Sequence, residues 1–244
     1  ESNIQNYNHL KIHSQFSICE GAIKIDDLKD FSKKNKIRCF GLSDTSNLCG
    51  ALEFAEKISK SGTQPIIGTQ INFRYGETTG LLPLYALNEE GYKRIIELSS
   101  LSYLNNDDIS DPHLKFDELL IKNNGVALFS GTINGFFGEL FNKGKFSEIK
   151  ELYNKLKSIY GDTFYIEIQR HNDLNEIAFE KFNLSVSLEL EIPLIATHEV
   201  FYLNKEMHEA HDALICIGEK NFVDENNRKK FSSQHYLKKN HELI

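Results

Sequence analysis

Cysteine, arginine and long apolar runs are all scarce in this sequence of 244 residues. The four cysteines, Cys19, Cys39, Cys49 and Cys216, have no CxxC spacing, which argues against a disulfide framework or zinc ribbon and indicates reduced thiols. Only five of the 28 cationic side chains are arginine, and 35 side chains are acidic, so we expect no dedicated nucleic-acid-binding surface. No apolar run could span a bilayer, and the opening residues lack a signal-peptide layout. These absences predict a soluble, cytoplasmic protein.

What is present favours one large α/β domain. A hydrophobic fraction of 40% is enough for a substantial core, and no linker rich in proline, glycine or serine divides the chain. Seven short apolar or alternating runs predict strands at residues 9–13, 39–43, 65–73, 81–87, 126–130, 164–169 and 193–197. Helical patterns lie between most of them, at residues 24–36, 47–60, 89–104, 146–160 and 174–190. This alternation predicts mainly parallel strands closed into one barrel.

One pair of strands departs from the alternation. Residues 74–80, with the sequence RYGETTG, make a short turn between the third and fourth predicted strands. We therefore expect these two strands to form an antiparallel hairpin.

Polar side chains follow several of the predicted strands. In barrels of this kind the chemistry gathers where strands end and the next loops begin, so these residues are the first candidates for a site. They are His13 and Ser14, Asp44 and Thr45, Gln70, residues 130–132, Arg170 and His171, and residues 197–199.

Several of these strand ends lie inside recognisable strings. HLKIHSQFS at residues 9–17, followed by Glu20, then LSDTSNLCG at 42–50 and PIIG at 65–68, resemble the PHP (polymerase and histidinol phosphatase) domain of bacterial DNA polymerase III alpha subunits. The similarity continues through NEEGY at 88–92, LFSG at 128–131, FYIE at 164–167 and IATHE at 195–199, and it ends near residue 236. The order and spacing of the strings make the resemblance specific.

The resemblance implies a distorted seven-stranded β/α barrel, in agreement with the seven predicted strands. Residues 1–244 would be the PHP domain of a larger polymerase, with the core barrel at about 7–217 and the start of a following region at 218–244. The sequence opens without methionine and ends within a helical pattern, which suggests an excised piece. The polymerase domains and their magnesium ions would then lie beyond Ile244, so we expect no cofactor in this fragment.

Competent PHP domains hold a metal cluster with histidines and carboxylates, and this sequence departs from their pattern. The resemblance assigns ligands to nine positions, which here are Lys11, His13, Glu20, Thr45, Gln70, Leu81, Thr132, Glu199 and Phe201. His13, Glu20 and Glu199 keep a ligating side chain. An ammonium group has no lone pair to offer, so Lys11 cannot replace an imidazole. We therefore predict a vestigial site with no metal, in which Lys11 neutralises Glu20 or Glu199.

The resemblance also implies a function. A PHP domain without its metals would have a structural and docking role, seating the proofreading exonuclease subunit and other replicase subunits, while DNA would bind the missing domains and the fragment alone would be inactive. The alternative is an active metal-dependent phosphoesterase or 3′–5′ proofreading exonuclease. A third class, a free-standing barrel enzyme, fits a resemblance along nearly the whole chain less well. No membrane partner is expected.

Three further features have ordinary structural explanations. His208 and His211 stand three residues apart, whereas a helical zinc-protease motif needs four, so helix surface and packing explain them better. The glycine-rich residues 131–138 lack the Rossmann spacing and the Walker lysine, which favours a tight turn. His171 would line the cleft or lie in solvent, and Asp44 would fix a loop by accepting backbone hydrogen bonds.

Overall fold

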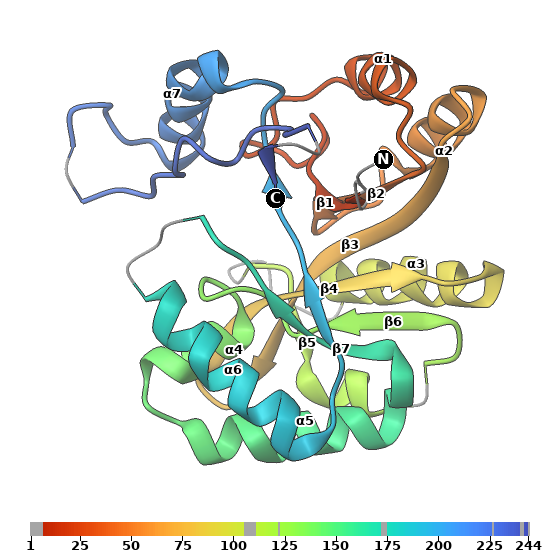
Figure 1. The fold of residues 1–244 in the computed structure, drawn as a ribbon. Coiled ribbons are helices and arrows are strands. Elements are labelled where there is room, and N and C mark those ends of the chain that lie inside the picture. Colours follow the sequence, from red (N-terminus) through yellow and green to blue (C-terminus); the bar gives the residue numbers. More distant parts are fainter. Residues whose placement is uncertain are drawn as a thin grey trace, which may run out of the picture. The chain divides into compact units, whose positions relative to one another are not determined.

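The computed structural model describes residues 7–104, 111–121, 123–171, 175–225, 227–239 and 242–243 (Figure 1). The chain divides into two compact units. Unit 1 consists of Glu1–Thr45, Cys49–Ile67 and His198–Ile244, and unit 2 of Ser46–Leu48 and Gly68–Thr197. The long strand β3 (Gln64–Tyr75) begins in unit 1 and ends in unit 2.

Unit 1 has short parallel strands covered by helices. Strand β1 (His9–Ile12) pairs in parallel with β2 (Cys39–Thr45) on one side and with the two-residue β9 (Glu199–Val200) on the other. The start of β3 follows β2 in the strand order. The helices of this unit are α1 (Ile25–Asn35), α2 (Ala51–Lys60) and α7 (His208–Glu219), with a 3-10 turn, η3, at Lys205–Met207.

Unit 2 has a mixed sheet in the order β8-β7-β6-β4-β3, with β5 pairing to β3. Its strands after β3 are β4 (Thr78–Ala86), β5 (Leu114–Lys115), β6 (Val126–Phe129), β7 (Phe164–Ile168) and β8 (Leu194–Ala196). Its helices are α3 (Glu89–Leu104), α4 (Phe136–Asn142), α5 (Phe146–Tyr160) and α6 (Glu176–Leu190), with 3-10 turns η1 (Phe116–Leu120) and η2 (Gly161–Thr163).

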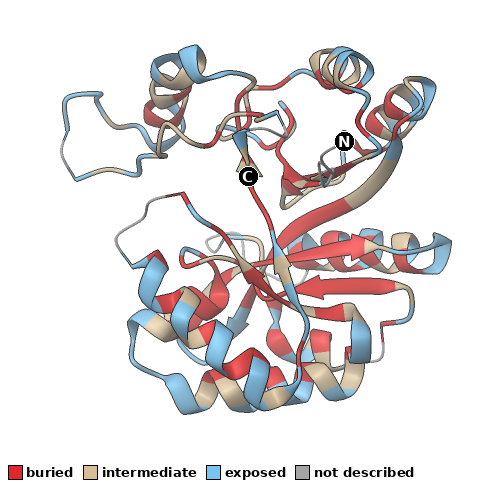
Figure 2. Cartoon of the chain, in the orientation of Figure 1, coloured by how far each residue is buried: buried red, intermediate tan, exposed pale blue. Residues whose placement is uncertain are grey.

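The core of unit 2 is aliphatic and aromatic. Most of β4 and β6 is buried (Figure 2). Phe116 stacks on Phe136 with ring centroids 5.1 Å apart, and Phe137 lies edge-on to Tyr153 at 4.6 Å. All four rings are buried, and they come from η1, α4 and α5. Burying rings of this size is among the larger stabilising contributions available to a domain.

The predicted α/β class is confirmed, and each of the seven predicted strands is present within about three residues of its expected bounds. The hairpin is confirmed as well, since β3 and β4 pair antiparallel from Gly68↔Tyr85 to Tyr75↔Thr78. The described residues contain nine strands rather than seven, because β5 and β9 have two residues each and too little pattern to detect. The predicted start of α6 at residue 174 lies outside the described residues. The division into a core barrel and a following region stays a prediction.

Within the part of the chain that is described, no helix is both long and apolar enough to cross a membrane.

Candidate functional site

The ends of two parallel strands and the start of a third bring polar side chains together in unit 1. His13 comes directly after β1, Asp44 and Thr45 end β2, and Glu199 opens β9. Strands β2 and β9 both pair in parallel with β1, so these residues become neighbours. His13 contacts Glu199 directly and is linked to Thr45 through Ser17.

Asp44 fixes the turn that follows β1. Its carboxylate accepts a hydrogen bond from the Ser14 amide at 2.6 Å and others from the hydroxyls of Ser14 and Ser17 at 2.7 and 3.1 Å. Burial raises the pKa of Asp44 above its usual value, although the hydrogen bonds from Ser14 and the charge of His13 act in the opposite direction. The expected loop-fixing role of Asp44 agrees with these contacts.

His13 is buried between a carboxylate and an aromatic ring. Its Nε2 donates to Glu199 Oε1 at 2.8 Å, since an ionised carboxylate can only accept. Its Nδ1 lies 2.9 Å from the hydroxyl of Ser17, which also accepts a hydrogen bond from the Thr45 amide at 2.9 Å. The ring stacks on Phe201 with centroids 4.2 Å apart and planes 19° from parallel. Because Nε2 carries the proton of this hydrogen bond, it has no lone pair with which to bind a metal.

Glu20 is held from two sides. One oxygen accepts a hydrogen bond from the Thr45 hydroxyl at 2.8 Å, and the other lies 3.0 Å from the ammonium of Lys229. Burial acts to raise the pKa of Glu20, but the charges of Lys229 and His13 and the hydrogen bonds outweigh it and lower that pKa. Lys229 is a site residue that the sequence prediction missed, because no local pattern marks it.

Lys11 is buried in β1, with 1% of its surface exposed. It is the register partner of Glu199 on the neighbouring strand β9, and paired residues of adjacent strands point to the same face. This agrees with the expected direction of the side chain. The ion pair of Lys11 with Glu20 or Glu199 stays a prediction.

Three predicted site residues belong to unit 2. The buried Gln70 lies opposite Pro83 in the hairpin, and its carbonyl accepts a hydrogen bond from the Ser46 amide at 2.7 Å. Leu81 lies opposite Asn72, and Thr132 follows Gly131, whose φ of +81° suits glycine. The Thr132 carbonyl accepts from the Gly135 amide at 3.0 Å, so this segment is a tight turn, as predicted.

The remaining histidines of the sequence prediction bind the backbone. His208 contacts the carbonyl of Phe231 at 3.0 Å, and His211 contacts the carbonyl of Glu20 at 2.7 Å, which agrees with packing roles. The solvent-exposed interpretation of His171 is wrong. That residue is 2% exposed because the chain turns inward and its amide donates to Glu176 at 2.8 Å.

A buried polar cluster in unit 2 was also missed. The carboxylate of Glu167 accepts hydrogen bonds from the hydroxyl of Thr197 and from the amide of Gln169, and all three residues are buried. Gln169 in turn donates to the Thr197 hydroxyl at 2.9 Å. The alternation along β7 could have placed Glu167 inward, but nothing in the sequence pairs it with Thr197.

Two buried histidines bind the backbone of the C-terminal segment of unit 1, at residues 236–238. His9 Nε2 donates to the carbonyl of Lys238 at 2.8 Å, and His198 Nε2 to that of Tyr236 at 3.0 Å. Burial lowers the pKa of His9 to about 4 and that of His198 to about 3. Among the described residues, the other ring nitrogen of His9 is buried without a hydrogen-bond partner.

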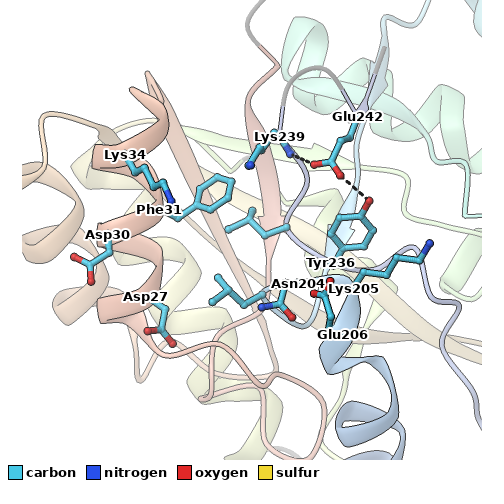
Figure 3. A pocket seen from close by; sticks show the side chains of 12 residues that line it. Asp27, Asp30, Phe31, Lys34, Asn204, Lys205, Glu206, Tyr236, Lys239 and Glu242 are labelled. Atoms are coloured by element: carbon cyan, nitrogen blue, oxygen red, sulfur yellow. Dashed lines mark hydrogen bonds between the residues drawn. The ribbon is translucent and has the colours of Figure 1, made fainter.

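This segment also forms one wall of an open groove of about 650 Å³ (Figure 3). Phe31, Lys34 and two aspartates of α1 form the opposite wall. Tyr236 donates to Glu242 at 3.0 Å, and both residues line the groove. No predicted site residue lines this groove, so it is separate from the site around His13, Glu20 and Glu199.

Solved structures share this fold. An amidohydrolase from Chromobacterium violaceum aligns with a TM-score of 0.52 over 80% of this chain and 87% of its own, at 12% identity. A two-domain protein from Bacteroides vulgatus, described as containing a predicted PHP-like metal-dependent phosphoesterase, aligns with a TM-score of 0.52 over 96% of this chain and 61% of its own, at 14% identity. At these identities the likeness concerns the fold alone.

The sequence defines the family. A profile of the PHP domain matches residues 9–171, and the chain belongs to the PHP domain family. DNA polymerase III subunit alpha of Caulobacter vibrioides is 33% identical over 248 residues, which cover 98% of this chain and 22% of that protein. The same subunit of Rickettsia conorii is 35% identical over 240 residues, covering 97% and 20%. The predicted resemblance is thus confirmed, and the chain spans about a fifth of the length of these relatives.

Proposed function

We propose that this chain is the PHP domain of a replicative DNA polymerase III alpha subunit and that it serves as a structural and docking domain. In this proposal it seats the proofreading exonuclease subunit and takes part in the cytoplasmic replicase. Nucleotidyl transfer, with its DNA and magnesium, belongs to other parts of the polymerase. The identities to alpha subunits along nearly the whole chain support the assignment.

The non-catalytic role is supported by the residues that occupy the positions to which the family resemblance assigns metal ligands. Thr45 donates its hydroxyl to Glu20, and Phe201 packs its ring on His13. Lys11 brings a positive charge into the strand beside Glu199. Among the described residues, no group of three or more histidine, cysteine, aspartate or glutamate side chains is arranged to hold a metal ion. The residues present therefore do not fit the metal cluster of the family.

The alternative is an active phosphoesterase or 3′–5′ exonuclease, and His13, Glu20 and Glu199 are the residues that favour it. Two-metal hydrolysis needs bridging carboxylates and several imidazoles around two ions about 4 Å apart. Of the nine ligand positions, His13 alone has an imidazole, and its Nε2 is directed at Glu199. This geometry supports the non-catalytic role over hydrolysis.

Hydrolysis assays separate the two functions. The chain, purified without chelator and supplied with manganese, zinc or iron, should cleave neither single-stranded DNA nor a simple phosphomonoester. Its bound metal, measured by mass spectrometry, should be well below one ion per chain. Metal-dependent turnover that His13→Ala abolishes would establish the alternative.

The docking role needs a binding measurement. We expect the chain to bind the proofreading exonuclease subunit of its own replicase in calorimetry, with the same affinity in the presence and absence of EDTA. His13→Ala, which removes the imidazole, is the matched variant and should bind equally well. Binding that is absent, or that EDTA abolishes, would contradict this role.

A further inference from the structure

We infer that Lys229 is the built-in cation of the vestigial site, with its ammonium neutralising Glu20 where a competent PHP domain would place a metal ion. This inference deepens the proposed loss of the metal site and rests on it. It also differs from the sequence prediction, which gave the neutralising role to Lys11.

The contacts of Lys229 define the role. Its Nζ lies 3.0 Å from Glu20 Oε1, while Thr45, at a ligand position of the family, holds the other oxygen. The Glu20 side chain is only 20% exposed, so its charge is poorly solvated by water. A cation at this distance favours the ionised carboxylate, in agreement with the lowered pKa of Glu20. The same ammonium lies 5.0 Å from the centroid of the Phe231 ring, a cation–π contact.

The segment after α7 is fixed so that Lys229 points at Glu20. The preceding residue, Arg228, makes a two-point contact with Asp212 of α7, at 2.6 and 2.7 Å. Its guanidinium also donates to the carbonyl of Val223 at 3.0 Å, which ties the segment to itself. The Lys229 amide faces Glu219 at 3.3 Å. Bidentate arginine pairs are geometrically specific, so this anchor limits where the lysine can reach.

Lysine suits this place because it provides a charge without needing ligands. A divalent ion would need several lone pairs around it, whereas an ammonium needs only acceptors for its three protons. Glu20 supplies such an acceptor, and the other two ligating side chains, His13 and Glu199, contact each other. A single cation, either the ammonium or one weakly held divalent ion in its absence, can therefore balance Glu20 where a metal cluster cannot assemble.

The test is a double-mutant cycle in thermal unfolding, with Lys229→Met, Glu20→Gln and the double variant. Methionine keeps most of the length of the unbranched side chain and removes its charge. We expect Lys229→Met to lower the midpoint by about 2–4 °C. It should lower the midpoint by much less when Glu20→Gln is already present. Lys230→Met, at the exposed neighbouring position, is the control and should have no effect. Equal shifts for the two lysine variants, or the same loss with and without Glu20, would overturn the inference.

Manganese then tests whether the ammonium stands in for a metal. Millimolar Mn²⁺ should leave the midpoint of the unaltered chain unchanged. It should raise that of Lys229→Met but not that of the double variant. If Mn²⁺ does not raise the midpoint of Lys229→Met, the inference that the ammonium takes the place of a metal ion is wrong. The proposed function would not be affected by that result. Stabilisation of the unaltered chain by Mn²⁺ would instead contradict the proposed loss of the metal site.

Discussion

Phe201 lies face to face with the imidazole of His13, with ring centroids 4.2 Å apart. It is 3% exposed and also packs on Phe231 at 4.4 Å. At a position to which the family resemblance assigns a metal ligand, this chain thus has a packed aromatic ring. Phe201→Ala should lower the free energy of unfolding by about 3–5 kcal/mol because it opens a cavity. Phe222→Ala, at a residue 77% exposed, should change it by less than about 0.5 kcal/mol. Urea unfolding measures both, and similar losses would contradict the packing role.

The turn after β1 should depend on the Asp44 carboxylate. Asp44→Ala leaves the Ser14 amide and two buried hydroxyls without their acceptor, and we expect a loss of about 2–4 kcal/mol in the free energy of unfolding. Asp44→Asn keeps one acceptor oxygen and should lose less. Asp30→Asn, at an exposed position of α1, is the control in the same denaturant series. A loss no larger for Asp44→Ala than for this control would contradict the loop-fixing role.

Gly21 has no room for a side chain. A Cβ built there would lie 1.9 Å from the carbonyl oxygen of Ser14, so the backbone itself would have to move. Gly21→Ala should destabilise the chain by about 3 kcal/mol or more, or prevent folding. Gly144→Ala is the comparison, since it has open space but a φ of +71° and should cost about 1–2 kcal/mol. Circular dichroism melts of the two variants distinguish a steric clash from a conformational cost.

His9 should make unit 1 sensitive to acid. Burial lowers its pKa in the folded state to about 4, against an ordinary value of 6.5. The unfolded chain therefore takes up a proton first as the pH falls. Its contribution is fully present above about pH 6.5 and is lost on the way down to about pH 4, with a total on the order of 2–4 kcal/mol.

His198 and Lys238 both face His9, so their charges contribute to the same acid response. His9→Gln should flatten the loss of stability between pH 6.5 and pH 4.5 in urea unfolding. His113→Gln, at a partly exposed histidine, should leave the curve unchanged. An equal pH dependence in the His9 variant and the unaltered chain would reject the assignment.

The strands and the strand-end residues could be predicted because their signals are local. Alternation along β1 and β2 places His13 and Asp44 at the end of each strand, and parallel pairing brings those ends together. The nine ligand positions, in contrast, came from the family resemblance, since spacing alone does not mark Thr45 or Phe201 as former ligand positions. Strand β9 was missed because two residues carry no period, and the strand exists only through its pairing with β1.

Contacts between distant parts of the chain could not be predicted. Lys229 and Glu20 are 209 positions apart in the sequence. No local pattern distinguishes Lys229 from its neighbour Lys230, so the sequence does not show which of them makes the contact. The carbonyls that His9 and His198 contact belong to an irregular segment whose backbone direction no pattern encodes. Burial of His171 likewise accompanies a hydrogen bond from its amide to the side chain of Glu176, which no local pattern predicts.

The assembly of unit 1 from three separate stretches has a consequence for the order of events on the ribosome. Every residue of unit 2 has been synthesised by Thr197, so its core can close while the last stretch of unit 1 does not yet exist. Strand β1 meanwhile has only β2 beside it and remains an open edge until β9 emerges. The bond from His9 to Lys238 joins residues 229 positions apart and can form only after the residues of unit 2 have been synthesised. Since domains generally fold as units during synthesis, the nascent chain exposes its first strand at least until Glu199 and Val200 have been synthesised.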